Sequence, residues 1–386
     1  MKIQIDQASR VVDSSTLAAL ADWVIEQAIG IQQIAAPTFS ERPRAELVAA
    51  QFAEHNLVDI DIDEVHNVYG RLQGTNPALA ALMVVAHTDT VFGAETDLTL
   101  RRDPQALYGP GIGDNSLGVG GMLGVLRMFF AQKVKPERDI WFVATSCEEG
   151  LGDLRGMRAA FSRLKTRLAG VVNIEGLAFG HVYHAGIAVK RLHIICHTPG
   201  GHSWLHFGRP SAIHVLMALG AKIAAIRPPT NPRTTHNIGL IDGGTSINSI
   251  AASASIWLDM RSEDMGALAR LEDDVRNLIH TVTTPETTFT VDVVGERPAG
   301  YLSPDHPLVR AAVEALSFVG VKATLETGST DGNIALAAGC PTVTVGVTRG
   351  GNAHRLDEYA ELAAVRDGMQ QLITLVLAAS TAGSVL

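Results

Sequence analysis

Short, continuous apolar runs constrain the fold of this chain more than any other feature of its sequence. ALMVVAH (81–87) and IWFVATS (140–146) are typical of strands that are buried on both faces of a sheet. VVNIE (171–175) and TVTVGV (342–347) repeat the pattern, and segments with a helical pattern, such as 115–132, separate these runs. Strands that alternate with helices predict an α/β layer with a mostly parallel sheet.

A central segment follows a different pattern. From about residue 187, alternating strand-like residues (IAVKRLHIICH) lead into a helix, two β segments, a second helix and a last strand. This βαββαβ order is that of a small ferredoxin-like α+β domain with its helices on one face of the sheet. We therefore predict a first domain built from residues 1–186 and 294–386, and a smaller domain, residues 187–293, inserted into it.

Composition excludes several classes of function. The chain has 31 Lys and Arg against 40 Asp and Glu, a net charge of −9, which argues against a nucleic-acid partner or an anionic membrane surface. Three scattered cysteines form no disulfide framework, and the N-terminus carries no apolar leader-like run. No window approaches the roughly 18 apolar residues of a membrane-spanning helix. We expect a cytoplasmic protein with no membrane partner.

Polar residues gather where predicted strands end, which is where ligands bind in an open parallel sheet. His87 and Asp89 lie two residues apart in AHTDT, so they point to the same side if the strand continues. Glu148 and Glu149 follow the next run in SCEEG, and neighbouring side chains there can serve as one metal ligand and one proton carrier. Each pair alone is a weak signal, because such residues also occur on ordinary solvated surface.

Asp114 follows a glycine-rich loop, GPGIGDNSLGVGG (109–121), at the mouth of a predicted helix. Asp at this position suits an N-cap. Alternatively, Gly111 and Gly113 would open the dinucleotide-binding loop of an oxidoreductase, although the third glycine of that pattern falls on Ser116 and no strand leads directly into the loop. A metal ligand is the third interpretation.

Two further donors extend the set of candidate ligands, because Glu175 ends VVNIE and His354 lies in GGNAHRLDE. Imidazole and carboxylate donors suit Zn²⁺ or a similar divalent ion, and the full set is His87, Asp114, Glu149, Glu175 and His354. Five ligands exceed one tetrahedral site. If Asp114 bridges, each of two ions roughly 3.5–4 Å apart receives that carboxylate and two other ligands, which leaves room for a shared water.

These motifs occur in the order found in the co-catalytic zinc exopeptidases and N-acyl amino acid hydrolases. HTDT, the GxGDN loop, CEEG, a Glu that ends a strand, GGHS and a His near the C-terminus match over nearly the whole chain. The chain therefore resembles this family, which includes peptidase T, carboxypeptidase G, aminoacylase and succinyl-diaminopimelate desuccinylase. TGSTDGNIALAAGCPTVTVGV, followed by GGNAH and DEY, is most similar to the peptidase T-like branch.

The resemblance implies a catalytic domain that holds two Zn²⁺ ions, with Co²⁺ or Mn²⁺ as substitutes. His87 and Glu175 would hold one ion, Glu149 and His354 would hold the other, and Asp114 would bridge them. The residue that matches Glu175 is Asp in some branches, including peptidase T itself, and Glu in relatives of carboxypeptidase G and aminoacylase. The substrate class therefore stays open.

The resemblance also implies roles for residues next to these ligands. Glu148 would be the general base that takes a proton from the water between the metals, and Asp89 would orient His87. The peptide bond after the bridging residue, Asp114–Asn115, would be cis.

By the same resemblance, the inserted domain is a lid and dimerisation domain. His202 in PGGHSW would reach across a homodimer interface into the partner's site and help to stabilise the oxyanion. Asn248 and Arg261 would bind the carboxylate or backbone of the substrate, and an Arg fork suits a planar carboxylate. Alternatively, His202 and His206 are only a pair of residues at a helix start.

The leading hypothesis is a di-zinc metallopeptidase, an exopeptidase of the aminopeptidase kind, that cleaves a peptide bond near a free terminus of a short peptide. An N-acyl amino acid deacylase needs the same metals and differs only in the substrate pocket. A metal-binding scaffold without activity and a nucleotide-binding oxidoreductase are the alternatives from other classes.

Overall fold

The computed structural model describes residues 13–381, 383 and 385–386, so residues 1–12, where we expect no leader, lie outside the described part. The described chain forms two compact units. Unit 1 runs to Gly186 and resumes at Gly300, and unit 2 comprises Ile187–Ala299. The boundary expected at residue 293 falls inside strand β14 (Thr288–Arg297), because the pairing of β14 with β9 (Ala188–His197) continues as far as Arg297.

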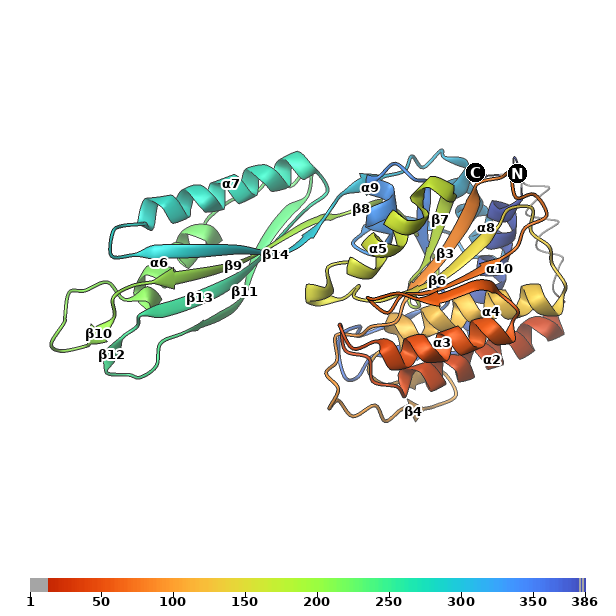
Figure 1. Ribbon diagram of the computed structural model, residues 1–386, viewed down its shortest axis with the longest axis horizontal. Coiled ribbons are helices and arrows are strands. Elements are labelled where there is room, and N and C mark those ends of the chain that lie inside the picture. The colour runs from red at the N-terminus through yellow and green to blue at the C-terminus, as the bar shows by residue number, and fades with distance from the viewer. Residues whose placement is uncertain (1–12, 382, 384) are drawn as a thin grey trace. The chain divides into compact units, whose positions relative to one another are not determined.

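Within the described residues, unit 1 is built on a nine-stranded sheet. Its strands are β1 (Val58–Ile62), β2 (Val68–Leu72), β3 (Ala81–His87), β6 (Ile140–Thr145), β7 (Leu168–Ile174), β8 (His181–Gly186), β15 (Gly300–Tyr301), β16 (Thr324–Gly328) and β17 (Thr342–Val345). They lie in the order β1-β2-β6-β3-β7-β17-β8-β15, and β16 pairs with β8. The central strands β6, β3, β7 and β17 are parallel, as Figure 1 shows for β6, β3 and β7, and this confirms the predicted α/β layer.

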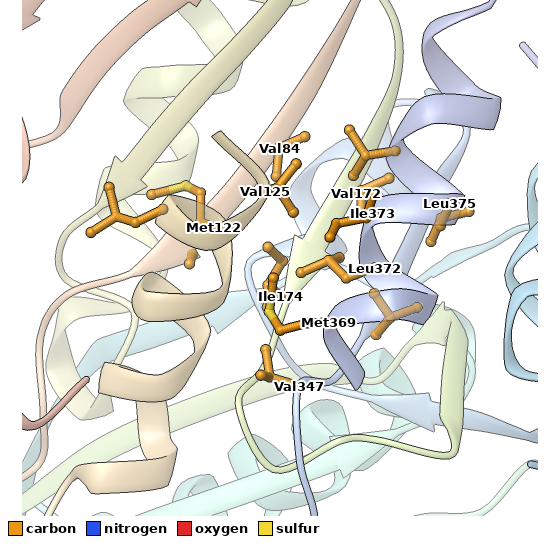
Figure 2. Close-up of a cluster of buried hydrophobic side chains, with 14 of the residues drawn as sticks. Val84, Met122, Val125, Val172, Ile174, Val347, Met369, Leu372, Ile373 and Leu375 are labelled. Atoms are coloured by element: carbon orange, nitrogen blue, oxygen red, sulfur yellow. The ribbon is translucent and has the colours of Figure 1, made fainter. Parts of the chain in front are cut away.

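The central strands are mostly apolar because both of their faces are buried, and Asn173 of β7 and Thr342 and Thr344 of β17 are buried polar exceptions. In β3, Leu82 and Val84 belong to one apolar cluster, whereas Met83 and Val85 belong to another. The first cluster is covered by α2 (Ser14–Gln32), α3 (Arg42–Glu54), α4 (Gly118–Ala131), α8 (Pro307–Phe318) and α10 (Val365–Ser380). The second is covered by α5 (Arg155–Leu164) and α9 (Gly332–Ala337). Figure 2 shows the first cluster, where side chains of α4 and α10 pack against the sheet.

Unit 2 is a four-stranded antiparallel sheet with two helices. The sheet has the order β11 (Thr234–Gly243), β13 (Ser253–Ser262), β9 and β14, and the helices are α6 (Ala212–Ala224) and α7 (Met265–Val282). In β9, alternate residues such as Leu192 and Ile194 pack against both helices, so only one face of the sheet is covered. The chain order confirms the predicted βαββαβ arrangement. A short pair, β10 (Gly201–His202) and β12 (Ser249–Ile250), lies outside the sheet.

A small antiparallel sheet in unit 1 brings two distant loops together. It consists of β18 (Gly350–Gly351), β19 (Tyr359–Glu361), β5 (Ala106–Tyr108) and β4 (Arg101–Arg102). The pairing of β5 with β19 places the loop after β5 beside the loop before β19. Two 3₁₀ turns, Gly150–Gly152 and Lys165–Arg167, lie elsewhere in unit 1, one before and one after α5.

The start of the helix expected over 115–132 differs from the prediction. A π-helical turn, Ile112–Leu117, precedes α4, and Asp114 has non-helical backbone angles within it. The N-cap interpretation of Asp114 is therefore wrong. The Asp114–Asn115 peptide bond is cis, as the family resemblance implies. In the described part of the chain, no helix has the length and apolar character that crossing a bilayer requires.

Candidate metal centre

The carboxyl ends of the central parallel strands carry most of the candidate ligands. His87 is the last residue of β3, Glu148 and Glu149 follow β6, and Glu175 follows β7. Because these three strands are neighbours and run parallel, their ends meet at one edge of the sheet. The sheet therefore gathers residues that are far apart in the sequence.

The remaining two candidates reach the same place from loops. Asp114 comes from the π-helical turn before α4, and His354 comes from the loop between β18 and β19. Asp114 Oδ1 lies 3.1 Å from His87 Nε2, and Asp114 Oδ2 lies 3.1 Å from His354 Nε2. Each oxygen of one carboxylate thus faces a different imidazole.

Two groups of potential ligands share Asp114. In the first, His87 Nε2 lies 3.5 Å from Glu175 Oε2, and in the second, His354 Nε2 lies 3.2 Å from Glu149 Oε1. Within each group the ligand atoms lie within 4.8 Å of one another. The structure thus brings together all five candidate ligands in the grouping that the resemblance implies, and their role as ligands stays a prediction.

These separations fit zinc coordination. Two atoms bound to a tetrahedral Zn²⁺ at roughly 2.0–2.1 Å are about 3.3–3.4 Å apart, as the geometry of a tetrahedron requires. The four contacts within the two groups measure between 3.1 and 3.5 Å. Imidazole nitrogen and carboxylate oxygen are also the donors that zinc prefers. The residues present therefore fit two divalent cations that share one carboxylate.

The electrostatics of the cluster point the same way. Burial, the largest single effect, lowers the pKa of His87, but nearby carboxylates, chiefly those of Glu175 and Asp114, more than offset it and hold this pKa well above its usual value. Hydrogen bonds to Asp114 and Glu149 raise the pKa of His354 to about 10. Burial raises the pKa of Glu149. The cluster therefore has an excess of negative charge, which bound cations would neutralise.

Asp89 lies beside the His87 ring and also contacts the loop after β6, and its role in orienting His87 stays a prediction. Its Oδ1 accepts a hydrogen bond from the Glu148 N–H (2.9 Å), and its Oδ2 accepts from the Glu149 N–H (3.0 Å) and the Thr38 hydroxyl (2.8 Å). His87 Nδ1 lies 3.6 Å from Asp89 Oδ1, which is too long for a hydrogen bond, and 3.2 Å from the backbone oxygen of Asp89. The carboxylate of Asp89 therefore fixes the turn that carries both glutamates.

Glu148 lies next to the candidate ligands without belonging to the two groups around Asp114. It is buried, and its carboxylate lies within 4.8 Å of ligand atoms of His87 and Glu149. The residue before it, Cys147, is not a candidate nucleophile, because burial raises the pKa of its thiol to about 12. Glu148 thus has the position that a proton carrier at this site requires.

The three candidates in the inserted segment do not form one group. His202 pairs with Ser249 in β10 and β12, and the Ser203 N–H donates to the Asn248 carbonyl at 3.0 Å, so His202 and Asn248 belong to one hairpin-like region. Strand β13 begins at Ser253, three residues after the end of β12. Arg261 lies eight residues further along β13, about 27 Å away at roughly 3.4 Å per residue, so it is far from the β12 end of the strand. Its guanidinium Nε donates to Asp259 Oδ2 at 2.7 Å.

Sequence reasoning missed two buried carboxylates near the centre. Asp331 accepts a hydrogen bond from the Thr145 hydroxyl at the end of β6, and burial raises the pKa of its carboxyl to about 7. Glu358 accepts hydrogen bonds from backbone N–H groups of the loop that carries Asp114. Both lie in stretches that carry the family resemblance, TGSTDG and DEY, and that was the only signal for either residue.

The centre has the side chains that a metal-dependent hydrolase requires, namely two groups of imidazole and carboxylate donors with the buried carboxylate of Glu148 beside them. Residues 83–378 match the model of Peptidase family M20/M25/M40. The chain belongs to this family, and the resemblance seen in the sequence is confirmed. The alternatives of an oxidoreductase and of a scaffold without activity are thereby wrong.

Relatives in the family have different substrates in their names. An acetylornithine deacetylase of Salmonella typhi is 25% identical over 358 residues, which cover 86% of this chain and 89% of the relative. A tripeptidase of Staphylococcus aureus superposes with a TM-score of 0.78 at 20% identity, over 93% of this chain and 98% of the other. Aminopeptidase PepT of Bacillus cereus has a TM-score of 0.75 at 18% identity, over 92% and 98%. At such identities the structural likeness establishes the fold alone.

Proposed function

We propose that this protein is a di-zinc exopeptidase that cleaves a peptide bond near a free terminus of a short peptide. The proposal rests above all on one observation: two groups of imidazole and carboxylate donors share Asp114 at the spacing of a zinc coordination shell. His87 and Glu175 would hold one ion, and Glu149 and His354 the other. Bound ions of this kind activate water and polarise the amide carbonyl.

Glu148 would act as the general base and acid. Its buried carboxylate lies beside the ligands, where it can take a proton from the attacking water and pass it to the leaving amine. Asp89 would orient His87, and it would also act on Glu148 indirectly, because its carboxylate accepts hydrogen bonds from the backbone N–H groups of both Glu148 and Glu149.

We also propose that the protein works as a homodimer through unit 2. Large apolar side chains of the hairpin-like region around His202 are exposed: Trp204 by 84%, Phe207 by 93% and Ile247 by 104%. Strand β11 lies at an edge of the unit 2 sheet, and edge strands are natural sites of pairing between chains. In such a dimer His202 would reach into the partner's site, while Asn248 and Arg261 would bind the carboxylate or backbone of the substrate.

A second candidate function is N-acyl amino acid deacylation, which the acetylornithine deacetylase of Salmonella typhi favours. Both reactions need the same centre and differ in the substrate pocket.

We also propose a cytoplasmic location, because Cys147, Cys196 and Cys340 are all free thiols, as is usual for proteins of a reducing compartment.

Metal analysis combined with a substrate panel tests these proposals. We expect two zinc, cobalt or manganese ions per chain and turnover of di- and tripeptides. Turnover of N-acetyl or N-succinyl amino acids instead would establish the deacylase. Sedimentation of the active protein as a monomer would contradict the dimer, and a metal-loaded protein that hydrolyses neither class would contradict both functions.

A further inference from the structure

Two loops that carry candidate ligands are joined by the small sheet of unit 1. Strand β19 pairs with β5 from Glu361↔Ala106 to Tyr359↔Tyr108. The ladder continues one step further, where the Gly109 N–H donates to the Glu358 carbonyl at 2.8 Å. Beyond this point the chains diverge into the loop that carries Asp114 and the loop that carries His354.

The side chain of Glu358 connects these two loops through hydrogen bonds to the backbone of the loop that carries Asp114. Its Oε1 accepts hydrogen bonds from the N–H groups of Gly113 (2.6 Å) and Asp114 (2.9 Å), and its Oε2 accepts from the N–H of Gly111 (3.2 Å). Glu358 has no solvent-exposed surface. Gly111 has a left-handed φ of +71°, a conformation that lets nearby backbone N–H groups converge on one anion.

This contact fixes the backbone of the residue that both groups of ligands share. The Asp114 N–H is bound to Glu358, while Asp114 Oδ1 and Oδ2 face His87 and His354 at 3.1 Å each. His354 itself lies four residues before Glu358, and the Glu358 N–H donates to the Arg355 carbonyl at 3.1 Å, which forms a turn directly after His354. Glu358 thus lies in the segment that carries His354, and its buried carboxylate binds the segment that carries Asp114, while Glu149, the third ligand of this group, comes from the loop after β6.

We propose that Glu358 is a positioning residue that sets the bridging carboxylate of Asp114 and the imidazole of His354 at the spacing that two cations need. The inference rests on the proposed di-metal function. Both carboxylate oxygens of Glu358 accept hydrogen bonds from backbone N–H groups. A glutamine at this position would replace one of these oxygens with an NH₂ group. In either orientation of the amide, this NH₂ group would face an N–H donor with which it can form no hydrogen bond. Substitution of residues that hydrogen-bond to metal-site elements typically weakens metal binding about 10- to 100-fold.

The test compares Glu358→Gln with Asp357→Asn. Both variants remove one negative charge at adjacent positions, but Asp357 is exposed and its carboxylate binds Arg355 (2.8 Å) and Asn352 (3.2 Å) rather than the loop that carries Asp114. Zn²⁺ and Co²⁺ titrations measure affinity and stoichiometry, and the visible spectrum of the Co²⁺ form reports its coordination geometry. We expect Glu358→Gln to bind metal about 10- to 100-fold more weakly, with an altered Co²⁺ spectrum and a kcat that falls more than KM changes. Asp357→Asn should match the wild type.

The outcomes separate this inference from the proposed function. If the wild type takes up no divalent metal, the di-metal function itself fails. If the wild type binds two cations and Glu358→Gln binds them with the same affinity and the same Co²⁺ spectrum, only the positioning role is overturned.

Glu358→Asp covers the case in which Glu358→Gln does not fold. It keeps two acceptor oxygens but withdraws them by one methylene, so we expect a folded protein with an intermediate metal affinity. If both variants remain unfolded at saturating Zn²⁺, the role of Glu358 is purely structural and the proposal is overturned.

Discussion

Units 1 and 2 use their sheets in opposite ways. The central strands of unit 1 are covered by helices on both faces, and the candidate metal ligands lie at the strand ends and in the loops beside them. The unit 2 sheet is covered on one face only, and its edge strand β11 and the region around Trp204 are exposed. A doubly covered sheet holds a reactive centre rigidly, whereas a half-covered sheet leaves surface for ligands or another chain.

The strongest test of this contrast removes the shared ligand. Asp114→Asn should weaken the binding of both metals by more than about 100-fold, since even changes outside the ligands cost 10- to 100-fold, and activity should fall to background. Chelation of the wild type should have the same effect. Unit 2 contains none of the metal-site groups found in the described residues, so its unfolding transition should not move. Retention of both metals in the variant would contradict the bridging role.

Removal of the proposed base should separate chemistry from metal binding. Glu148→Gln should lower kcat by about 10²–10⁴-fold, the usual contribution of general acid–base catalysis, while two metals remain bound. Steady-state kinetics and metal analysis of the same preparation measure both quantities. Wild-type kcat in this variant would rule out Glu148 as the base.

A unit 2 residue should affect turnover without affecting the metals. His202→Ala should lower kcat by about 10²–10³-fold, the typical cost of one oxyanion donor, with unchanged metal content. His197→Ala is the matched control. His197 is an exposed histidine on β9, and its ring forms a hydrogen bond with the hydroxyl of Thr290. Equal kcat values for the two variants would leave His202 without a catalytic role.

A core substitution tests whether unit 2 is energetically separate. Ile194 on β9 has no exposed surface and packs between the sheet and its helices. Ile194→Ala should lower the free energy of unfolding of unit 2 by about 2–5 kcal/mol, as followed by calorimetry. The metal affinity of unit 1 should be unchanged, and a parallel loss of metal affinity would show that the two units unfold together.

The smallest expected effect concerns the start of α7. The Asp264 side chain accepts a hydrogen bond from the Ala267 N–H at 2.7 Å, so it caps the helix. Asp264→Ala should destabilise unit 2 by about 1 kcal/mol. Denaturant unfolding of this variant beside Ile194→Ala should rank the two, and a larger loss from the cap than from the core would contradict the packing described for unit 2.

The sequence predicted the elements whose pattern is local. The run at 81–87 coincides with β3, and the run at 140–146 exceeds β6 by one residue, because burial on both faces leaves a continuous apolar signature. The turn around Asp114 was harder to predict. A π-helical turn stabilised by a distant carboxylate has no periodic pattern, so the sequence left an N-cap and a metal ligand as interpretations of Asp114 and gave no sign of the turn itself.

The roles of Asp89 and Glu358 show the same limit. The resemblance implied that Asp89 orients His87, but nothing in the sequence indicated that the same carboxylate also accepts the N–H groups of Glu148 and Glu149. Glu358 acts on a loop 244 residues away in the sequence, so no local signal pointed to that contact. Hydrogen-bond partners depend on where the chain returns, which residue types and short spacings do not encode.

By itself, the sequence determined the doubly buried sheet, the inserted βαββαβ unit and the residue types from which a metal centre can be built, because burial and chemistry are properties of local pattern and side chain. Only the tertiary structure decided that Asp114 turns one oxygen to each histidine and that a remote glutamate holds its backbone. The physical reason is that a coordination shell requires separations of a few ångströms between groups from different strands and loops, and these separations are set by packing of the whole unit.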